Sequence, residues 1–542
     1  MKKTRQETQK TSRWAALATM CALVCGVAGA QVAQNPHAEG SRWWKDVSFL
    51  ASDDLQGRMT GSGGYQAAAG YVAEQFKKEG LTPAGTIGFF QPVKFESREL
   101  DEAYSSVELI QGGNTTPLTL GKEVILSAMG DSGEDITADA VFVGYGISAP
   151  EANYDDFAGL DLRGKVAVYL AGGPDTIKDP LRAHEESSGE RWKAMKAAGA
   201  IGVAVILNSA NQEVPWERIA GNRRPALELA DASLRRDQGK ELSLTVNPEY
   251  ADTFFAGSGH TLAEIMAAAK AKQPLPKFPL AVRIHAKTKV KETDMESPNV
   301  AGELEGSDPK LKKEIVIVSA HLDHLGIGAP VNGDDVYNGA MDNAAGVAAL
   351  IQIAHDFRES KVKPKRSVVF LALCGEEEGE LGSWYFANHP TVPPDEIVAD
   401  INMDMFLPLF PLEYLQVQGL DESTLGEDIR AAGQADGVKV IADEQPDANR
   451  FIRSDQYSFV QKGIPALAFK FGYEKGSPQE KTFNDWVHTR YHAPSDDLNQ
   501  KVDQDAAGKF CHLIYMLADR VADDAERPTW ESASFFRRFA AK

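Results

Sequence analysis

Ile315-Val-Ile-Val-Ser-Ala-His-Leu-Asp-His324 decides the expected fold, because a strand-like apolar run ends abruptly in residues that can bind a metal. Two further apolar runs end in the same way: Glu376-Glu-Glu378 closely follows residues 368–373, and Asn402-Met-Asp404 follows residues 397–401. Buried parallel strands read as continuous β-branched runs. Open α/β sheets build their sites just beyond the carboxyl ends of such strands. The pattern therefore predicts that polar groups from several strands converge on one point.

The C-terminal half of the chain is expected to form the main sheet. From residue 280 onward, strand-like and helix-like segments alternate, which is typical of an α/β fold with a mostly parallel mixed sheet and helices on both faces. The clearest helix follows Asp342 and Asn343, whose side-chain oxygens can cap its free amides. Its apolar face is made by Val347, Leu350, Ile351, Ala354 and Phe357.

Five residues of the kinds that bind zinc lie in these segments and near the C-terminus: His321, Asp342, Glu377, Asp404 and His492. Zn²⁺ takes histidine nitrogen and carboxylate oxygen readily, and a site for two ions usually needs a carboxylate that bridges them. Taken singly, an aspartate at a helix start is more often a cap, and a histidine after a strand is more often a core residue. Because most of the five lie at strand ends, beside an adjacent pair of glutamates, together they predict a metal-dependent enzyme.

Length, charge and cysteine content narrow the class of protein. With 542 residues the chain is too long for one ordinary core, so two or more domains are expected. The net charge of −21 disfavours binding to nucleic acid or to an anionic membrane surface. Only Cys374 and Cys511 lie beyond the N-terminal segment, so no disulfide scaffold is implied, although one bridge between these two stays open.

The N-terminus has the order of a secretory signal peptide. Basic residues up to Arg13 precede an apolar stretch over residues 14–27, and Ala28-Gly-Ala30 supplies a cleavage site of small residues. The apolar stretch is short for a membrane-spanning helix, and an uncleaved anchor is the alternative. We expect residues 1–30 to be removed and the mature protein to be periplasmic or secreted, with no membrane insertion after the signal is removed.

A separate compositional unit interrupts the chain. Strand-like runs such as 140–147 and 201–207 lead to a proline-rich exit at residues 272–277. We place an inserted domain at residues 132–275 and the main domain at residues 31–131 and 276–542. Because the insert carries no cluster of ligand-type residues, we expect it to fold around its own core and to shape substrate access without contributing chemistry. On this view, a short linker in its place would leave the metal site intact.

The order of the motifs resembles the di-zinc exopeptidases of peptidase clan MH, which include bacterial leucyl-type aminopeptidases and glutamate carboxypeptidase II. The matching segments are Leu55-Gln-Gly-Arg58, Ala320-His-Leu-Asp-His-Leu-Gly326, Gly339-Ala-Met-Asp-Asn-Ala-Ala-Gly346, Gly375-Glu-Glu-Glu-Gly-Glu-Leu-Gly-Ser383, Asn402-Met-Asp-Met405, Arg453-Ser-Asp-Gln456, Gly463-Ile-Pro-Ala466 and Tyr491-His-Ala-Pro494. The insert, around Val143-Gly-Tyr-Gly146, resembles the protease-associated domain that these enzymes often carry. The resemblance implies a zinc-exopeptidase fold, of the phosphorylase/hydrolase-like kind, with a β-rich α/β insert.

The same resemblance implies which residues hold two Zn²⁺ ions. Asp342 would bridge the two ions. His321 and Asp404 would complete the shell of one ion, and Glu377 and His492 the shell of the other.

It also implies roles for residues that do not bind metal. Glu376 would be the general base that takes a proton from the attacking water. Asp323 would hold the imidazole of His321 in the right tautomer, and Tyr491 would donate a hydrogen bond to the oxyanion. Glu378 is expected to be a variable, solvated position, and a register slipped by one glutamate is the rival interpretation. Gln456, where relatives frequently carry histidine, is expected to alter substrate contacts.

Three classes of function stay open. A di-zinc aminopeptidase that removes N-terminal residues from peptides is favoured, with a carboxypeptidase or dipeptidase on the same scaffold as the alternative. The catalytic half shows no cluster of arginines that would clamp a C-terminal carboxylate, which favours the first of these. A non-catalytic binding protein is disfavoured because all five ligands and Glu376 are present. A glutaminyl-cyclase-like transferase is disfavoured because those relatives use a single zinc.

Overall fold

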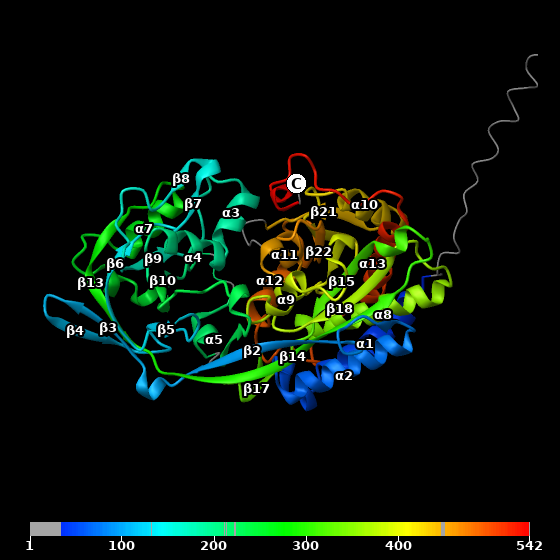
Figure 1. Cartoon of the computed structure of the whole chain (residues 1–542), viewed down its shortest axis with the longest axis horizontal. Coiled ribbons are helices and arrows are strands. Elements are labelled where there is room, and N and C mark those ends of the chain that lie inside the picture. Colours follow the sequence, from blue (N-terminus) through cyan, green and yellow to red (C-terminus); the bar gives the residue numbers. More distant parts are fainter. Residues whose placement is uncertain are drawn as a thin grey trace, which may run out of the picture.

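The structure, a computed structural model, describes residues 34–540 except 132, 211, 213, 222–223 and 446–449. Over these residues the chain forms two large sheets that lie side by side (Figure 1). One is a 10-stranded sheet in the order β11-β2-β14-β18-β15-β19-β22-β20-β21, with β1 paired to β14. The other is an 8-stranded sheet in the order β4-β3-β13-β6-β9-β10-β12-β5. The candidate metal ligands all lie in the part of the chain that forms the first sheet.

The centre of the first sheet consists of four parallel strands: β15 (Ile315–His321), β18 (Ser367–Leu373), β19 (Ile397–Asn402) and β22 (Ala466–Gly472). The three apolar runs of the sequence are therefore neighbours, with β15 between β18 and β19. Alternate side chains of β15 enter two different cores, since Val316 and Val318 pack on one face and Ile317 on the other. A strand buried on both faces needs the continuous apolar run that the sequence shows.

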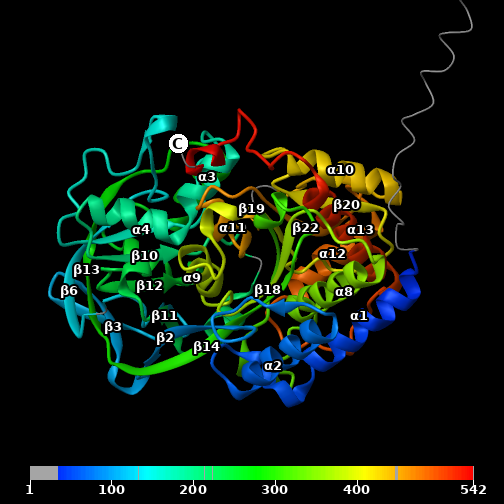
Figure 2. The ribbon, with the colours of Figure 1, turned by 45° about the vertical axis from the view of Figure 1, so that its right-hand side comes forward.

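Helices cover both faces of this sheet (Figure 2). One face carries α1 (Pro36–Leu50), α2 (Gly63–Lys78), α8 (Ala345–Ser360) and α13 (Gln504–Asp523). The other face carries α9 (Leu381–Asn388) and α11 (Gln456–Val460), whose Phe386 and Phe459 pack in the same core as Ile317. The predicted α/β class is confirmed.

Parallel pairing is limited to the centre and to one edge of the sheet. β2 (Phe90–Leu100) and β14 (Val290–Leu304) form a long antiparallel pair beside β18. At the other end, β20 (Tyr414–Gln418) is antiparallel to β22 and parallel to β21 (Lys439–Ala442). The sheet is therefore mixed. Its central strands are parallel, so their carboxyl ends, which carry candidate ligands, lie at the same edge of the sheet.

The second sheet reaches beyond the predicted limits of the insert. Its strands are β3 (Ser106–Gln111), β4 (Asn114–Leu118), β5 (Val124–Leu126), β6 (Asp135–Phe142), β9 (Val166–Leu170), β10 (Gly202–Ile206), β12 (Leu242–Val246) and β13 (Phe278–Lys287). The unit therefore begins near Ser106 and ends near Lys287, and the predicted limits of 132 and 275 are too narrow. The reason is pairing at long range, since β3 and β6 both pair with β13 across more than 100 residues of chain. As expected, this unit has a hydrophobic core of its own.

One part of the insert belongs to the first sheet. Strand β11 (Ala226–Leu229) pairs antiparallel with β2, and Leu227 and Leu229 are buried in the core of the first sheet. Helix α5 (Trp216–Gly221) precedes this strand. We call the described residues of 216–236 the crossing segment, because the chain leaves the second sheet after β10 and returns to it at β12.

The remaining elements are short or peripheral. They are β1 (Thr82–Pro83), β7 (Ser148–Ala149), β8 (Tyr154–Asp155), β16 (Gly326–Val331), β17 (Asp334–Tyr337), α3 (Asp179–Glu186), α4 (Ser188–Ala197), α6 (Asp252–Phe255), α7 (Leu262–Lys270), α10 (Leu425–Asp436) and α12 (Pro478–Thr489). In the described part of the chain, Cys374 and Cys511 are both buried and free, and no helix has the length and apolar character needed to span a bilayer. The predicted signal peptide lies outside the described residues.

Candidate metal centre

The five predicted ligands reach one place from five different segments. His321 is the last residue of β15, while Glu377 follows β18 and Asp404 follows β19. Asp342 lies in the tight turn just before α8, and His492 lies in the loop after α12. Asn343 Oδ1 accepts a hydrogen bond from the backbone N–H of Gly346 at 3.0 Å, and so satisfies a free amide in the first turn of α8. Asp342 is therefore free to point toward the strand ends instead of capping the helix.

The distances divide the five residues into two sets that share Asp342. His321 Nε2 lies 3.3 Å from Asp342 Oδ1 and 3.4 Å from Asp404 Oδ1. His492 Nε2 lies 3.4 Å from Asp342 Oδ2 and 3.1 Å from Glu377 Oε2. Two ligands of a tetrahedral zinc, each at about 2.0–2.1 Å from the ion, are about 3.3–3.4 Å apart. Each set therefore has the spacing of ligands around one ion, and each uses a different oxygen of Asp342.

His324 joins the second set in a different way. Its Nδ1 lies 2.6 Å from Glu377 Oε1 and 3.8 Å from Asp342 Oδ2. A separation of 2.6 Å is too short for two ligands of one zinc ion and fits a hydrogen bond. His324 thus holds one oxygen of Glu377 while the other oxygen faces His492. His324 therefore supports the site through its contact to Glu377.

The chemistry of the cluster fits a bound cation. Donor atoms of His321, Asp342 and Asp404 lie within 4.8 Å of one another, as do those of His324, Asp342 and Glu377. Asp342 is 2 % exposed, and neither its Oδ2 nor His324 Nε2 has a hydrogen-bond partner among the described residues. Carboxylates buried close together are costly unless they are paired or coordinate a metal. Bound zinc would satisfy the unpartnered oxygen and offset the excess negative charge.

The pKa values in the cluster separate Glu376 from Glu377. Burial raises the pKa of Glu376 well above its usual value, with His321 opposing the shift. Burial also acts on Glu377, but the neighbouring His492 and His324 outweigh it and hold the pKa of Glu377 well below its usual value. Glu377 is therefore the carboxylate suited to bind a cation, and Glu376 is the one suited to accept a proton.

Asp323 supports the site, but through a contact other than the one expected. Its Oδ1 accepts the backbone N–H of Glu376 at 3.2 Å, and its Oδ2 accepts that of Glu377 at 3.3 Å. The carboxylate lies 3.9 Å from His321 Nδ1, which is too far for a hydrogen bond. The partner of His321 Nδ1 is instead the backbone oxygen of Asp323, at 3.2 Å. The side chain of Asp323 thus fixes the glutamate loop, and only its carbonyl orients the imidazole.

Two buried residues that sequence reasoning did not assign to the site hold the turn of Asp342. Asp496 accepts the backbone N–H groups of Met341 and Asp342 at 3.0 Å. Arg58, fully buried, donates to the carbonyls of Asn338 and Gly339 at 2.6 and 3.0 Å. The sequence motif that contains Arg58 does not reveal which groups Arg58 binds, because these carbonyls lie about 280 residues further along the chain.

Two expectations about neighbouring residues were wrong. Glu378 is not solvated: its side chain is 10 % exposed and pairs with Arg224 at 3.1 Å, on the wall of a cavity. Gln456 does not face a substrate, because it is fully buried and bonds Asn402 Nδ2 at 2.6 Å and the carbonyl of Phe451. In both cases the partner comes from a segment distant in sequence, so the pattern around the residue does not reveal it.

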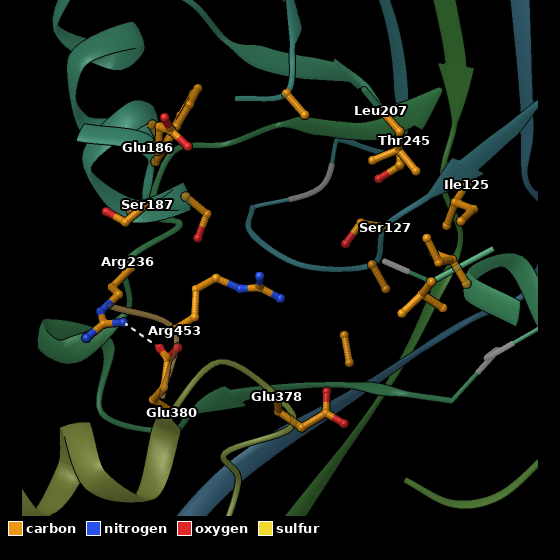
Figure 3. A pocket seen from close by; sticks show the side chains of 18 of the residues that line it. Ile125, Ser127, Glu186, Ser187, Leu207, Arg236, Thr245, Glu378, Glu380 and Arg453 are labelled. Atoms are coloured by element: carbon orange, nitrogen blue, oxygen red, sulfur yellow. Dashed lines mark hydrogen bonds and ion pairs between the residues drawn. The ribbon is translucent and has the colours of Figure 1, made fainter. Parts of the chain in front are cut away.

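The cluster opens onto a cavity of about 1740 Å³ between the two sheets, lined in part by Tyr491 and His492. Figure 3 shows Arg453 pointing into this cavity, near the ion pair of Arg236 with Glu380. A second cavity of about 50 Å³ lies beside Asp404 and is also lined by Tyr491 and Arg453. Burial raises the pKa of Tyr491 well above its usual value, so its hydroxyl keeps its proton at neutral pH and can donate.

Known proteins with similar sequences match parts of the chain. A 207-residue stretch is 25 % identical to Leupeptin-inactivating enzyme 1 of Streptomyces exfoliatus, over 37 % of this chain and 43 % of that protein. A 122-residue stretch is 28 % identical to Carboxypeptidase Q of Xenopus laevis, over 22 % of this chain and 24 % of that protein. In both cases the match spans less than half of the relative's length.

Among solved structures, an aminopeptidase from Aneurinibacillus sp. strain AM-1 has the same fold. It aligns with a TM-score of 0.54 and 21 % identity, over 88 % of this chain and 92 % of that one. The model of Peptidase family M28 matches residues 299–518, which hold all five predicted ligands. Through this segment, the chain is similar to Peptidase family M28.

Proposed function

We propose that the protein is a zinc aminopeptidase that removes N-terminal residues from peptides and uses two metal ions. The observation that carries the proposal is the shared aspartate: Asp342 Oδ1 lies 3.3 Å from His321 Nε2, which also contacts Asp404, and Asp342 Oδ2 lies 3.4 Å from His492 Nε2, which also contacts Glu377. A bridging carboxylate is the hallmark of a two-metal site. The match of residues 299–518 to the model of Peptidase family M28 and the spacing of the predicted ligands support the same function.

Each ion would be held by three residues. His321, Asp342 and Asp404 would bind one ion, and His492, Asp342 and Glu377 the other, with His324 as a hydrogen-bond donor to Glu377. Bound zinc would supply Lewis-acid activation of a water and of the scissile carbonyl. Asp323, Asp496 and Arg58 would keep the ligand-bearing turns in place, as supporting groups do in metal sites.

The chain itself supplies a base and a hydrogen-bond donor. Glu376 accepts the proton of the attacking water at its carboxylate and returns it to the leaving amine. Its position next to Glu377, on the loop fixed by Asp323, keeps it close to the ions without making it a ligand. Tyr491, whose ring lies 3.9 Å from that of His492, donates its hydroxyl proton to the oxyanion. General acid–base transfer of this kind contributes about 10²–10⁴-fold.

A substrate panel tests this function directly. Aminoacyl-p-nitroanilides, N-blocked dipeptides and C-blocked dipeptides are offered to the purified protein with and without a chelator. An aminopeptidase cleaves the anilides and the C-blocked dipeptides, fails on the N-blocked ones, and stops when the metal is removed. Cleavage of N-blocked dipeptides alone would refute the proposal.

A carboxypeptidase or dipeptidase is the second candidate, and one observation favours it. Arg453 points into the large cavity and also lines the small one beside Asp404 (Figure 3). A guanidinium there can bind a carboxylate in a bidentate manner, and one relative is named Carboxypeptidase Q. If this candidate is right, dipeptides with a free C-terminus are cleaved, and Arg453→Gln raises KM for them while leaving the anilides unaffected.

We also propose that the protein acts outside the cytoplasm as a periplasmic or secreted enzyme, with peptides as its partners. The basic, apolar and small-residue order of residues 1–30 supports export. N-terminal sequencing of the exported protein should begin at or near Gln31. An intact leader in the membrane fraction would show an anchor instead.

A further inference from the structure

The crossing segment of the insert contacts the two loops that carry Glu377 and His492. After β10 the chain leaves the second sheet, forms α5, runs through β11 in the first sheet, and returns. Leu227 and Leu229 anchor this segment in the core of the first sheet, where they are 0 % and 2 % exposed. Trp384 adds a second anchor by donating its indole N–H to the carbonyl of Leu234 at 3.0 Å. The crossing segment is thus packed against the main domain, although it belongs in sequence to the insert.

Arg218 holds the loop of His492. Its Nη1 donates to the carbonyl of Tyr491 at 2.7 Å, and its Nη2 donates to the carbonyl of His488 at 3.3 Å. His488 lies in the last turn of α12, where carbonyls lack partners within the helix and favour a cation. Because Tyr491 immediately precedes His492, this clamp fixes the backbone from which His492 reaches Asp342 and Glu377.

Arg224 holds the loop of Glu377. Its Nη2 donates to the carbonyl of Glu377 at 3.0 Å, and its Nη1 lies 3.1 Å from Glu378 Oε1. Both side chains are largely buried, with Arg224 14 % and Glu378 10 % exposed. Arg224 therefore binds the backbone of one predicted ligand and the side chain of the residue after it.

Arg218 and Arg224 hold two loops whose predicted ligands would share one ion. Glu377 follows β18 and His492 follows α12, yet Glu377 Oε2 and His492 Nε2 lie 3.1 Å apart. His321 and Asp404, on the other side of Asp342, sit at or next to the ends of adjacent strands of the same sheet. The sheet alone sets the geometry of that side, whereas the side of Glu377 and His492 depends on loops.

We infer that Arg218 and Arg224 are positioning residues that set the affinity of the ion held by Glu377 and His492. The inference rests on the proposed two-metal function and adds to it that the insert holds in place the two loops that carry Glu377 and His492. Groups that orient ligands from outside the coordination shell typically change metal affinity by 10–100-fold when removed. The ion held by His321 and Asp404 should be indifferent to both arginines.

The test is a zinc titration of the metal-free full-length protein, comparing wild type with the double variant Arg218→Ala/Arg224→Ala. We expect two binding events in the wild type. In the variant we expect the Kd of one event to rise about 10–100-fold and the other to stay unchanged. Anomalous scattering at the zinc edge from crystals grown at limiting zinc assigns the weakened ion, whose occupancy should fall on the His492 side alone.

Arg235→Ala is the matched control. Arg235 also lies on the crossing segment, but among the described residues its ion pairs are with Glu96 on β2 at 2.6 Å and with Glu228 on β11 at 3.4 Å, away from both ligand loops. Its loss should leave both zinc affinities unchanged. Should the double variant fail to fold, Arg218→Lys and Arg224→Lys are titrated singly, because a lysine cannot make both bonds of either guanidinium.

Wild-type affinity for both ions in the folded variants would overturn the inference, and so would an equal loss at both ions. A wild type that binds fewer than two ions would instead contradict the proposed function. The two failures are therefore distinguishable in one experiment.

Discussion

At the scale of single residues, the adjacent Glu376 and Glu377 have different tasks, and substitution separates them. Glu376→Gln should lower kcat by about 10²–10⁴-fold, because an amide cannot accept the proton, while zinc content stays unchanged. Glu377→Gln should weaken the binding of one ion, because a neutral amide is a poor zinc ligand. Steady-state kinetics and elemental analysis of both variants check this. Loss of zinc in Glu376→Gln with retention in Glu377→Gln would reverse the assignment.

Tyr491 offers a second test at this scale. Tyr491→Phe keeps the ring against His492 and removes only the hydroxyl. We expect kcat to fall by about 10²–10³-fold with little change in KM, as happens when one donor to an oxyanion is lost. The measurement is kinetics on an aminoacyl-p-nitroanilide, with zinc content as the control. An unchanged kcat would show that the oxyanion is stabilised by other groups.

The sequence is informative about site residues whose position depends on a strand end or a helix start. The placement of His321, Glu377 and Asp404 at one edge of the sheet could be predicted because each lies at or just beyond the end of an apolar run, and the three runs are adjacent parallel strands. The contacts predicted for Asp323 and Gln456 were wrong, because the residue type and its position in a motif do not determine the direction in which the side chain points. The bonds of Arg218 and Arg224 join residues more than 150 positions apart, and no local pattern encodes such contacts.

At the scale of elements, α8 carries a buried acid that makes stability depend on pH. Burial, and after it the charge of Glu39 on α1, raise the pKa of Asp356 to about 8, with hydrogen bonding from Gln352 opposing. The unfolded value is about 3.9. The folded state therefore binds a proton that the unfolded state releases, so the free energy of unfolding falls as pH rises from about 4 to 8.

Asp356→Asn should remove this dependence. We expect the variant to be more stable than wild type by about 2–5 kcal/mol at pH 8, since one pKa unit corresponds to about 1.4 kcal/mol, and to lose this advantage near pH 4. Denaturant unfolding at several pH values measures the difference. Asp395→Asn, at an exposed position, is the control and should leave the pH dependence as it is. A constant difference between Asp356→Asn and wild type across this range would contradict the assignment.

Elements with strong periodicity were predictable, and those defined by distant pairing were not. The run before His321 and the apolar face of the helix after Asp342 became β15 and α8. Strand β11 is only four residues long and joins a sheet whose other strands lie outside the insert. Its membership follows from pairing with β2, which is a property of the folded chain and not of the strand's own sequence.

At the scale of the whole molecule, the insert makes more contacts with the main domain than the sequence indicates. The sequence predicts that a Gly/Ser linker in place of residues 132–275 leaves both zincs bound. The contacts of the crossing segment lead us to expect a different outcome, because that replacement also deletes β11, Arg218 and Arg224. We expect the linker protein to unfold at a lower temperature and to lose affinity for the ion near His492. Thermal unfolding and zinc titration measure both effects, and two wild-type zinc affinities would contradict the prediction.

The metal centre at Asp342 is the central claim, and adding zinc back to the metal-free protein tests it most directly. The measurement is the rate of p-nitroaniline release from an aminoacyl-p-nitroanilide as zinc is added in known equivalents. We predict no activity without zinc, full activity only after two equivalents per chain, and none at any zinc level that fills the wild-type site when Asp342 is replaced by Asn. Full activity in the metal-free protein, or saturation at one equivalent, would contradict the account.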